Sequence, residues 1–217
     1  MIDHPAKFSR GILPTAAKLL NGAGLCVLDP MAGTGRAFEL GAWGHRVWCV
    51  DIEPEYEVLA GEVGSSWTVG DARALPFLAD MFDAVVTSPP YGNRMADKLS
   101  KDGDRRRTYA DYLGRDLSPG NAAAAQWGDE YRRLMREIWV EVDRVVKRSG
   151  QVILNCKDHY RSGELQFVTA WHVECLGALG WGVVEAVEVE APGYGGRANA
   201  YPPLPENVIS LSKECAK

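Results

Sequence analysis

Short apolar runs that end in an acidic or hydroxyl residue alternate with helical segments along the first half of this chain. The runs cover residues 25–29, 46–51, 66–71 and 82–88, and they end in Asp29, Asp51, Asp71 and Ser88. Strands that alternate with helices predict a parallel sheet covered on both faces. Because ligands of such sheets bind beyond the carboxyl ends of the strands, we expect these four residues to line one site.

The rest of the chain continues this α/β pattern. Helices are predicted over residues 14–20 and 35–44, from Pro54 onward, and over 130–150 and 164–180; further strands are predicted over 151–156, 181–190 and 207–212. The helix over 130–150 has strong helical spacing of apolar residues, with Gly150 as its stop signal. The last two strands have no helix between them, which predicts an antiparallel pair at one sheet edge. We expect a single Rossmann-like domain over residues 1–217, with a mostly parallel seven-stranded sheet.

Residues 92–120 interrupt the alternation, and we interpret them as an inserted loop region. Six of the 24 lysines and arginines lie between Lys98 and Arg115, interleaved with aspartates. A long stretch without periodicity inside a domain is usually functional or disordered. The net charge of −5 argues against binding nucleic acid by overall charge alone. A local basic face and a solvated surface loop both remain open for this segment.

Composition favours a cytoplasmic protein without a membrane partner. No apolar run approaches the length that spans a bilayer, and residues 1–10 lack the apolar core of a secretion signal. The five cysteines are odd in number and show no Cys-x-x-Cys spacing, which favours reduced thiols. We find no constellation typical of a metal centre or of serine-nucleophile chemistry.

The segment "LDPMAGTGR", residues 28–36, indicates a nucleotide-like ligand. Gly33 and Gly35 allow the backbone to approach a ligand closely. The dinucleotide fingerprint needs a third glycine where Phe38 stands, and no Gly-Lys-Ser/Thr ending is present. Asp51 follows Gly33 by 18 residues, the usual place for a carboxylate that accepts from ribose hydroxyls, and Asp71 could accept from an adenine amine. Each acid alone could be a helix N-cap, but together they favour a bound adenosine.

Three motifs resemble those of S-adenosylmethionine (SAM)-dependent methyltransferases that alkylate exocyclic amines of DNA bases. "DPMAGTG" (29–35) resembles the family's Asp-Pro-Phe-x-Gly-x-Gly cofactor loop, with Met31 in place of the aromatic residue. "HPAKFS" (4–9) resembles the motif that precedes this loop, and "TSPPYG" (87–92) resembles the catalytic Ser/Asp/Asn-Pro-Pro-Tyr. The resemblance covers residues 4–91 and extends to the later strands only by their order. It implies the class I methyltransferase fold and SAM as the cofactor.

The resemblance also implies roles for individual residues. The expected cofactor contacts are Phe8, Asp29, Pro30, Met31, Ala32, Gly33, Gly35, Asp51, Ile52, Asp71, Ala72 and Ser88. The expected catalytic residues are Ser88, Pro89, Pro90 and Tyr91. Apart from the motif residue Tyr91, the candidates for substrate contacts come from residue type and position rather than from the resemblance: Asn93, Arg94, Arg105, Arg106, Arg107, Lys157 and His159.

The Ser-Pro-Pro-Tyr segment suits the chemistry of an amine whose lone pair is delocalised into an aromatic ring. Acceptors beside the amine hydrogens localise that pair as positive charge develops. The Ser88 side chain and the Pro89 carbonyl are the candidates, and two prolines hold them rigidly. Tyr91 could stack on a base that is flipped out or single-stranded. The simpler alternative is a Pro-Pro turn with a surface tyrosine.

The first residue of the motif bears on the substrate. By resemblance, serine is commoner in enzymes that modify cytosine N4, and aspartate or asparagine in those that modify adenine N6. We therefore expect DNA as the partner and cytosine N4 as the target. The alternatives are adenine-N6 methylation, methylation of guanine N2 in RNA or of a protein glutamine amide, and a nucleic-acid-binding subunit without activity. Because only 92–120 and 192–205 are available for target recognition, a partner subunit or a second copy could supply it.

Overall fold

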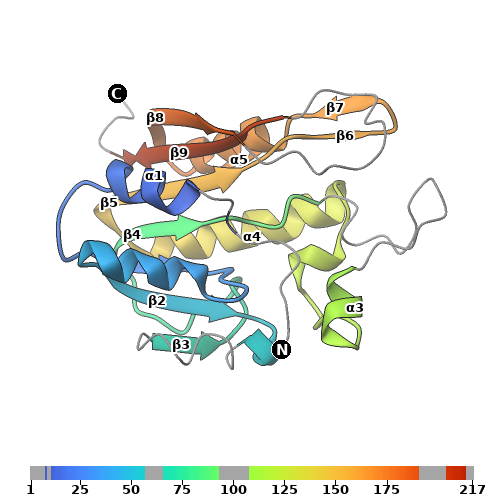
Figure 1. Cartoon of the computed structure of the whole chain (residues 1–217), viewed down its shortest axis with the longest axis horizontal. Helices are drawn as coiled ribbons and strands as arrows, with labels where there is room; N and C mark the ends of the chain where they lie inside the picture. Colours follow the sequence, from blue (N-terminus) through green and yellow to red (C-terminus); the bar gives the residue numbers. More distant parts are fainter. Residues whose placement is uncertain (1–7, 9–10, 57–65, 93–107, 191–203, 214–217) are drawn as a thin grey trace.

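A seven-stranded sheet forms the centre of the computed structural model, which describes residue 8 and residues 11–56, 66–92, 108–190 and 204–213 (Figure 1). Its strands are β1 (Cys26–Asp29), β2 (Arg46–Asp51), β3 (Ser66–Val69), β4 (Phe82–Thr87), β5 (Val146–Cys156), β8 (Gly182–Val189) and β9 (Glu206–Ser212). Their order is β3-β2-β1-β4-β5-β9-β8. The first five strands in this order are parallel, and β9 is antiparallel to both of its neighbours. The α/β class, the seven strands and the antiparallel pair at one edge are thereby confirmed.

Helices cover both faces of the sheet. Helix α1 (Ile12–Leu19) and the 3-10 helix η1 (Arg36–Trp43) lie in front of it in Figure 1, and α4 (Asp129–Val145) and α5 (Val168–Ala178) lie behind. Successive strand residues point to opposite faces. Val27 accordingly packs in the core cluster under α1 and η1, whereas Leu28 packs in the cluster under α4 and α5. Burial on both faces explains why the strands appear as continuous apolar runs.

The boundary between α4 and β5 differs from the prediction. The helix ends at Val145, and residues 146–150 belong to β5 rather than to the helix. Val146, the first strand residue, is β-branched, which favours extended backbone. Gly150 is not the helix stop: a Cβ there would lie 2.6 Å from Val146 Cγ1 and 2.8 Å from the Asp83 carbonyl oxygen. The glycine is required by this close approach inside the sheet.

A hairpin replaces the start of the predicted helix over 164–180. Strand β6 (His159–Arg161) pairs antiparallel with β7 (Glu164–Gln166), and α5 begins only at Val168. The two turn residues, Ser162 and Gly163, have φ values of 52° and 92°. Positive φ at both positions is typical of the two-residue turns that connect the strands of a β-hairpin. The Ser-Gly pair was the signal that the sequence-based prediction missed.

The remaining helices are short. The helix predicted from Pro54 is a single 3-10 turn within the described residues, η2 (Pro54–Tyr56), and the helix predicted over 35–44 is the 3-10 helix η1. Of the interrupting segment 92–120, residues 93–107 lie outside the described ranges. Its described part contains α3 (Tyr109–Leu113) and is followed by the 3-10 turn η4 (Ala122–Ala124). Figure 1 shows α3 beyond the carboxyl ends of β2 and β3.

Two further predictions concern thiols and membranes. The cysteines in the described ranges, Cys26, Cys49, Cys156 and Cys175, are free thiols. Burial raises the pKa of Cys156 to about 12 and that of Cys49 well above its ordinary value, so both are unreactive structural groups.

Among the helices that the structure describes, none combines the length and the apolar character needed to cross a bilayer.

Candidate active site

Hydrogen bonds join the carboxyl ends of β1, β2, β3 and β4. The Thr87 hydroxyl, at the end of β4, donates to Asp29 Oδ1 at the end of β1, over 2.8 Å. The backbone N–H of Gly33 donates to Asp51 Oδ2 over 2.7 Å, and that of Gly70 donates to the Asp51 carbonyl over 2.9 Å. The acidic strand ends therefore meet at one edge of the sheet, as the sequence predicts.

The glycine loop between β1 and η1 adopts backbone conformations that suit glycine. Gly33 has a φ of 51° and Gly35 a φ of 73°, in the left-handed region that L side chains rarely adopt. The backbone N–H of Ala32 donates to the Val50 carbonyl over 3.0 Å, which brings the loop to the end of β2. The loop thus presents backbone without Cβ atoms at the place where the strands meet.

Two carboxyl groups at this edge, the buried Asp29 and the half-buried Asp51, have raised pKa values. Burial raises the pKa of Asp29 to about 7, although hydrogen bonds from Thr87 and from the Met31 backbone lower it. Burial also raises the pKa of Asp51 to about 7, and the negative charges of Glu53 and Asp29 add to this effect. A positively charged ligand beside these groups would favour their ionised forms. The site is suited to a cation.

Asp71 is engaged by a neighbouring arginine. Its Oδ1 accepts from the Arg73 backbone N–H over 2.9 Å, and its Oδ2 accepts from Arg73 Nη2 over 2.6 Å. Burial alone would raise the pKa of Asp71, but the bonds from Arg73 lower it below its usual range. Asp71 thus caps a turn rather than a helix, because no helix lies between β3 and β4 in the described residues.

The other residues expected at the cofactor are buried or half-buried in the two core clusters or at the strand ends. Phe8 packs against the core cluster under α1, and Met31 packs against the cluster under α4. Pro30, Ala32 and Ala72 are buried, and Ile52 is half-buried beside Asp51.

The Ser88–Tyr91 elbow follows β4 directly, and a polar cluster holds its two hydroxyl groups together. Ser88 Oγ lies 3.0 Å from Tyr91 Oη, and Asn155 Nδ2 lies 3.3 Å from each of them. The same amide nitrogen donates to Glu206 Oε2 over 3.1 Å. Burial raises the pKa of Tyr91 well above its ordinary value. The Tyr91 hydroxyl is thus turned toward Ser88, and its ring packs partly against the core.

Two backbone carbonyls fix the elbow from its other side. The Pro90 carbonyl accepts from the Tyr131 hydroxyl, and the Gly92 carbonyl accepts from the Trp127 backbone N–H over 2.7 Å. Gly92 has a φ of +59°, and a Cβ there would lie 2.8 Å from the Trp127 nitrogen. The glycine after the tetrapeptide is therefore needed for close contact with the segment before α4.

Glu53 anchors the described part of the interrupting segment to the end of β2. Its carboxylate accepts from Asn121 Nδ2 over 2.6 Å, from the Ser118 backbone N–H over 2.8 Å and from Arg115 Nη2 over 2.6 Å. Burial would raise the pKa of Glu53, but these bonds together lower it. Sequence reasoning missed this residue, because its partners lie more than 60 residues away.

Replacement of Glu53 by alanine is expected to lower the free energy of unfolding by about 1–3 kcal/mol, the range for losing hydrogen bonds to a buried charged group. The matched control is Glu55→Ala, which removes a carboxylate that binds the same Arg115 but is partly exposed. A surface pair of this kind contributes at most about 1 kcal/mol. Urea unfolding of both variants measures the difference. Equal effects of the two substitutions would contradict the anchoring role of Glu53.

The predicted substrate contacts are described only in part. Asn93, Arg94, Arg105, Arg106 and Arg107 lie outside the described residues. Lys157 follows β5 and is half-buried. His159 on β6 meets the Trp127 ring edge-on at 6.4 Å between ring centroids, and burial lowers the pKa of its imidazole. His159 thus lies next to the segment that contacts Gly92.

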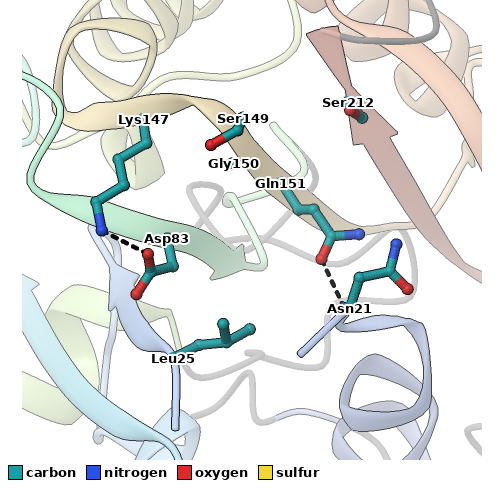
Figure 2. A pocket seen from close by; sticks show the side chains of 8 residues that line it. All are labelled: Asn21, Leu25, Asp83, Lys147, Ser149, Gly150, Gln151 and Ser212. Carbon is teal, nitrogen blue, oxygen red and sulfur yellow. Dashed lines mark hydrogen bonds and ion pairs between the residues drawn. The ribbon is translucent and has the colours of Figure 1, made fainter. Parts of the chain in front are cut away.

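A separate cavity of about 250 Å³ lies near the amino ends of the parallel strands, on the side of the sheet opposite to the acidic strand ends (Figure 2). Figure 2 shows Lys147 paired with Asp83 over 2.6 Å, and Gln151 Oε1 accepting from the Asn21 backbone N–H over 2.7 Å. These residues lie at the amino ends of β4 and β5 or in the loop after α1. The cavity is therefore remote from the acidic strand ends and the elbow.

Comparison with known proteins finds similarity at the level of the fold. No family model matches the sequence, and a search of curated proteins found no significant match. Among solved structures, a SAM-dependent methyltransferase from Methanosarcina mazei is 16% identical, with a TM-score of 0.59 over 92% of this chain and 97% of that one. The Burkholderia thailandensis 1,6-didemethyltoxoflavin-N1-methyltransferase, with bound S-adenosylhomocysteine, is 17% identical, with a TM-score of 0.57 over 93% and 77%.

The fold also supports other chemistry. The [4+2]-cyclase SpnF is 13% identical, with a TM-score of 0.58 over 93% of this chain and 80% of that one. At these identities the similarity shows the class I methyltransferase fold alone, and the same fold hosts different activities.

Proposed function

We propose that the chain is a SAM-dependent methyltransferase that acts on an exocyclic amine of a DNA base, with cytosine N4 as the preferred target. The observation that carries the proposal is the position of the Ser88–Tyr91 elbow. It follows β4 directly, and Thr87 at the end of β4 is hydrogen-bonded to Asp29 in the neighbouring glycine-loop strand. The two proposed acceptors, the Ser88 hydroxyl and the Pro89 carbonyl, therefore follow a strand that is hydrogen-bonded to the start of the glycine loop.

The residues at the ends of β1 and β2 fit SAM. Each Asp51 oxygen accepts one backbone hydrogen bond, from Glu53 or from Gly33, and each has capacity for another from a ribose hydroxyl. The carboxyl groups of the buried Asp29 and the half-buried Asp51 would be stabilised in their ionised forms by a ligand that carries a sulfonium and an ammonium group. When bound, SAM supplies an electrophilic methyl group. The neighbour from Burkholderia thailandensis, which holds the demethylated product of SAM, supports this choice.

The elbow provides what a weakly nucleophilic amine needs. Ser88 Oγ and the Pro89 carbonyl accept the two amine hydrogens, so the nitrogen lone pair is directed toward the methyl donor. The prolines fix φ at two successive residues, which leaves little freedom to lose when the amine binds. No strong base is required, because the amine nitrogen becomes acidic once it is methylated.

The hydroxyl of Ser88 supports cytosine as the target. A hydroxyl can donate as well as accept, and the ring nitrogen beside the amine is an acceptor in cytosine. Adenine shares this feature, whereas the corresponding nitrogen of guanine carries a hydrogen. A guanine-N2 target therefore fits Ser88 less well.

Transfer of labelled methyl groups from SAM tests the proposal directly. The acceptors are duplex DNA, single-stranded DNA, structured RNA and a protein mixture, each with the same enzyme preparation. The proposed function predicts incorporation into DNA. Label in RNA or protein alone would support the alternative substrates, and calorimetric titration that detects no SAM binding would indicate a subunit without activity.

SAM affinity is expected to fall as the pH drops below 7. The pKa values of Asp29 and Asp51 are raised to about 7 in the free protein, and a cationic ligand favours the ionised forms. Protons must then be released for binding below pH 7, so the Kd rises from pH 8 to pH 6 by up to about tenfold for each acid that must be ionised. Titration calorimetry measures this change, and the variant Asp51→Asn is expected to show a flatter profile. A pH-independent Kd would contradict the role of the two acids.

A further inference from the structure

A buried chain of hydrogen bonds runs from α4 through α5 to the elbow. Trp139 Nε1 donates to His172 Nδ1 over 3.0 Å, and His172 Nε2 lies 3.0 Å from Tyr131 Oη. The Tyr131 hydroxyl in turn donates to the Pro90 carbonyl. All three side chains are fully buried, each with an exposed fraction of 0%.

One group that can only donate fixes the donor and acceptor roles in this whole series of hydrogen bonds. The Trp139 indole nitrogen is such a donor, so His172 Nδ1 must be the unprotonated, accepting nitrogen. A neutral imidazole then carries its hydrogen on Nε2 and donates it to Tyr131 Oη. Because its oxygen accepts from His172, Tyr131 directs its own hydrogen to the Pro90 carbonyl.

The surroundings of His172 keep it neutral. Burial lowers the pKa of its imidazole to about 3. The rings of Tyr131, Trp139 and Trp171 surround it. Because His172 stays neutral over the working pH range, it takes no part in acid–base chemistry. Its fixed tautomer gives the series of hydrogen bonds a single direction.

We propose that Tyr131 is a positioning residue for methyl transfer, held in its donating orientation by His172 and Trp139. Its hydroxyl fixes the Pro90–Tyr91 peptide plane, and through the two rigid prolines it fixes the direction of the Pro89 carbonyl and of Ser88. The proposal depends on the proposed function of the elbow. A purely structural role would need only the packing of the three rings between α4 and α5.

Tyr131→Phe separates these roles, because it removes one hydroxyl and keeps the ring. The expected result is a loss in kcat of about 10- to 100-fold at saturating SAM and DNA, since small displacements of reacting groups have effects of this size. The Kd for SAM should stay within about twofold of wild type. His172→Gln, whose amide can still donate near the position of Nε2, should keep more activity than His172→Phe. Unchanged kcat in Tyr131→Phe would overturn the proposal.

Trp181→Phe is the matched control for Trp139→Phe. Trp181 is also buried and donates its indole N–H, to Asp143 Oδ1 over 2.8 Å, but it precedes β8 at the opposite edge of the sheet. Both substitutions remove the indole hydrogen bond of a buried tryptophan and should lower the Tm. Only Trp139→Phe should lower kcat. Equal losses of kcat in the two variants would show that the Trp139–His172–Tyr131 hydrogen bonds contribute to stability alone.

Two measurements do not depend on activity, so a wrong proposed function can be distinguished from a wrong positioning role. Nitrogen NMR of His172 should show the Nε2–H tautomer and no titration between pH 5 and pH 9. A crystal structure of Tyr131→Phe should show the Pro90 carbonyl displaced while the sheet is unchanged. The opposite tautomer, or an elbow that does not move, would overturn the positioning role even if wild type methylates DNA. If both results are as expected and wild type transfers no methyl group, the proposed function is wrong instead.

Discussion

Replacement of Ser88 by alanine will abolish most methyl transfer while SAM still binds. The substitution removes the hydroxyl that we propose as an acceptor for the amine hydrogens, and it leaves the glycine loop and Asp51 intact. Loss of one preorganised hydrogen-bonding group at a reacting centre typically lowers kcat by about 100- to 1000-fold. Single-turnover assays with labelled SAM measure the rate, and calorimetry measures the Kd for SAM.

Two further variants define what Ser88 contributes. Ser149→Ala, in the cavity near the amino ends of the parallel strands, is the control and should turn over as wild type does. Ser88→Asn offers an amide oxygen as a replacement acceptor and should recover part of the activity that Ser88→Ala loses. Full turnover of Ser88→Ala would show that the hydroxyl has no acceptor role.

Replacement of Asp51 by alanine is expected to weaken SAM binding by about 10- to 100-fold, the effect of losing hydrogen bonds to a charged group. The carboxylate would no longer accept from the ribose, and Gly33 would lose the acceptor that holds its backbone N–H. Asp51→Asn keeps one oxygen acceptor and should bind with intermediate affinity. Calorimetric titration of both variants at pH 8 provides the comparison. Wild-type affinity in Asp51→Ala would mean that the adenosine does not bind at this strand end.

Asp71 offers a contrast at the next strand end. Its carboxylate is paired with Arg73. To contact the adenine amine, the carboxylate would have to accept from Arg73 and from the amine at the same time. If Asp71→Ala keeps the wild-type Kd for SAM while Asp51→Ala does not, the role of Asp71 is to cap the turn after β3. A large loss of affinity would assign it to the adenine.

The sequence predicted most of the fold because the signals for it are local. Strand ends marked by Asp29, Asp51 and Ser88 could be recognised from short apolar runs, and the glycine loop from its spacing. Two local signals were misjudged. The Ser162-Gly163 pair was not recognised as a hairpin turn, and Gly150 was taken for a helix stop although it permits a close approach of β5 to β4.

The polar groups around the elbow could not be predicted, because they depend on contacts between distant parts of the chain. Asn155 lies 67 residues from Ser88, Glu206 lies 51 residues from Asn155, and Tyr131 lies 41 residues from Pro90. In the sequence, Asn155 is one polar residue at the end of an apolar run, and His172 is a lone histidine in a helix. Only the strand order places β5 between β4 and β9, and with it Asn155 between Ser88 and Glu206.

Mass spectrometry of nucleosides from DNA incubated with the protein and SAM tests the proposed methyl transfer to cytosine N4. We expect N4-methylcytosine in DNA treated with wild type and none in DNA treated with Ser88→Ala. N6-methyladenine in place of N4-methylcytosine would keep the chemistry and change the target base. DNA that acquires no methylated amine, although the protein binds SAM, would contradict the proposed function.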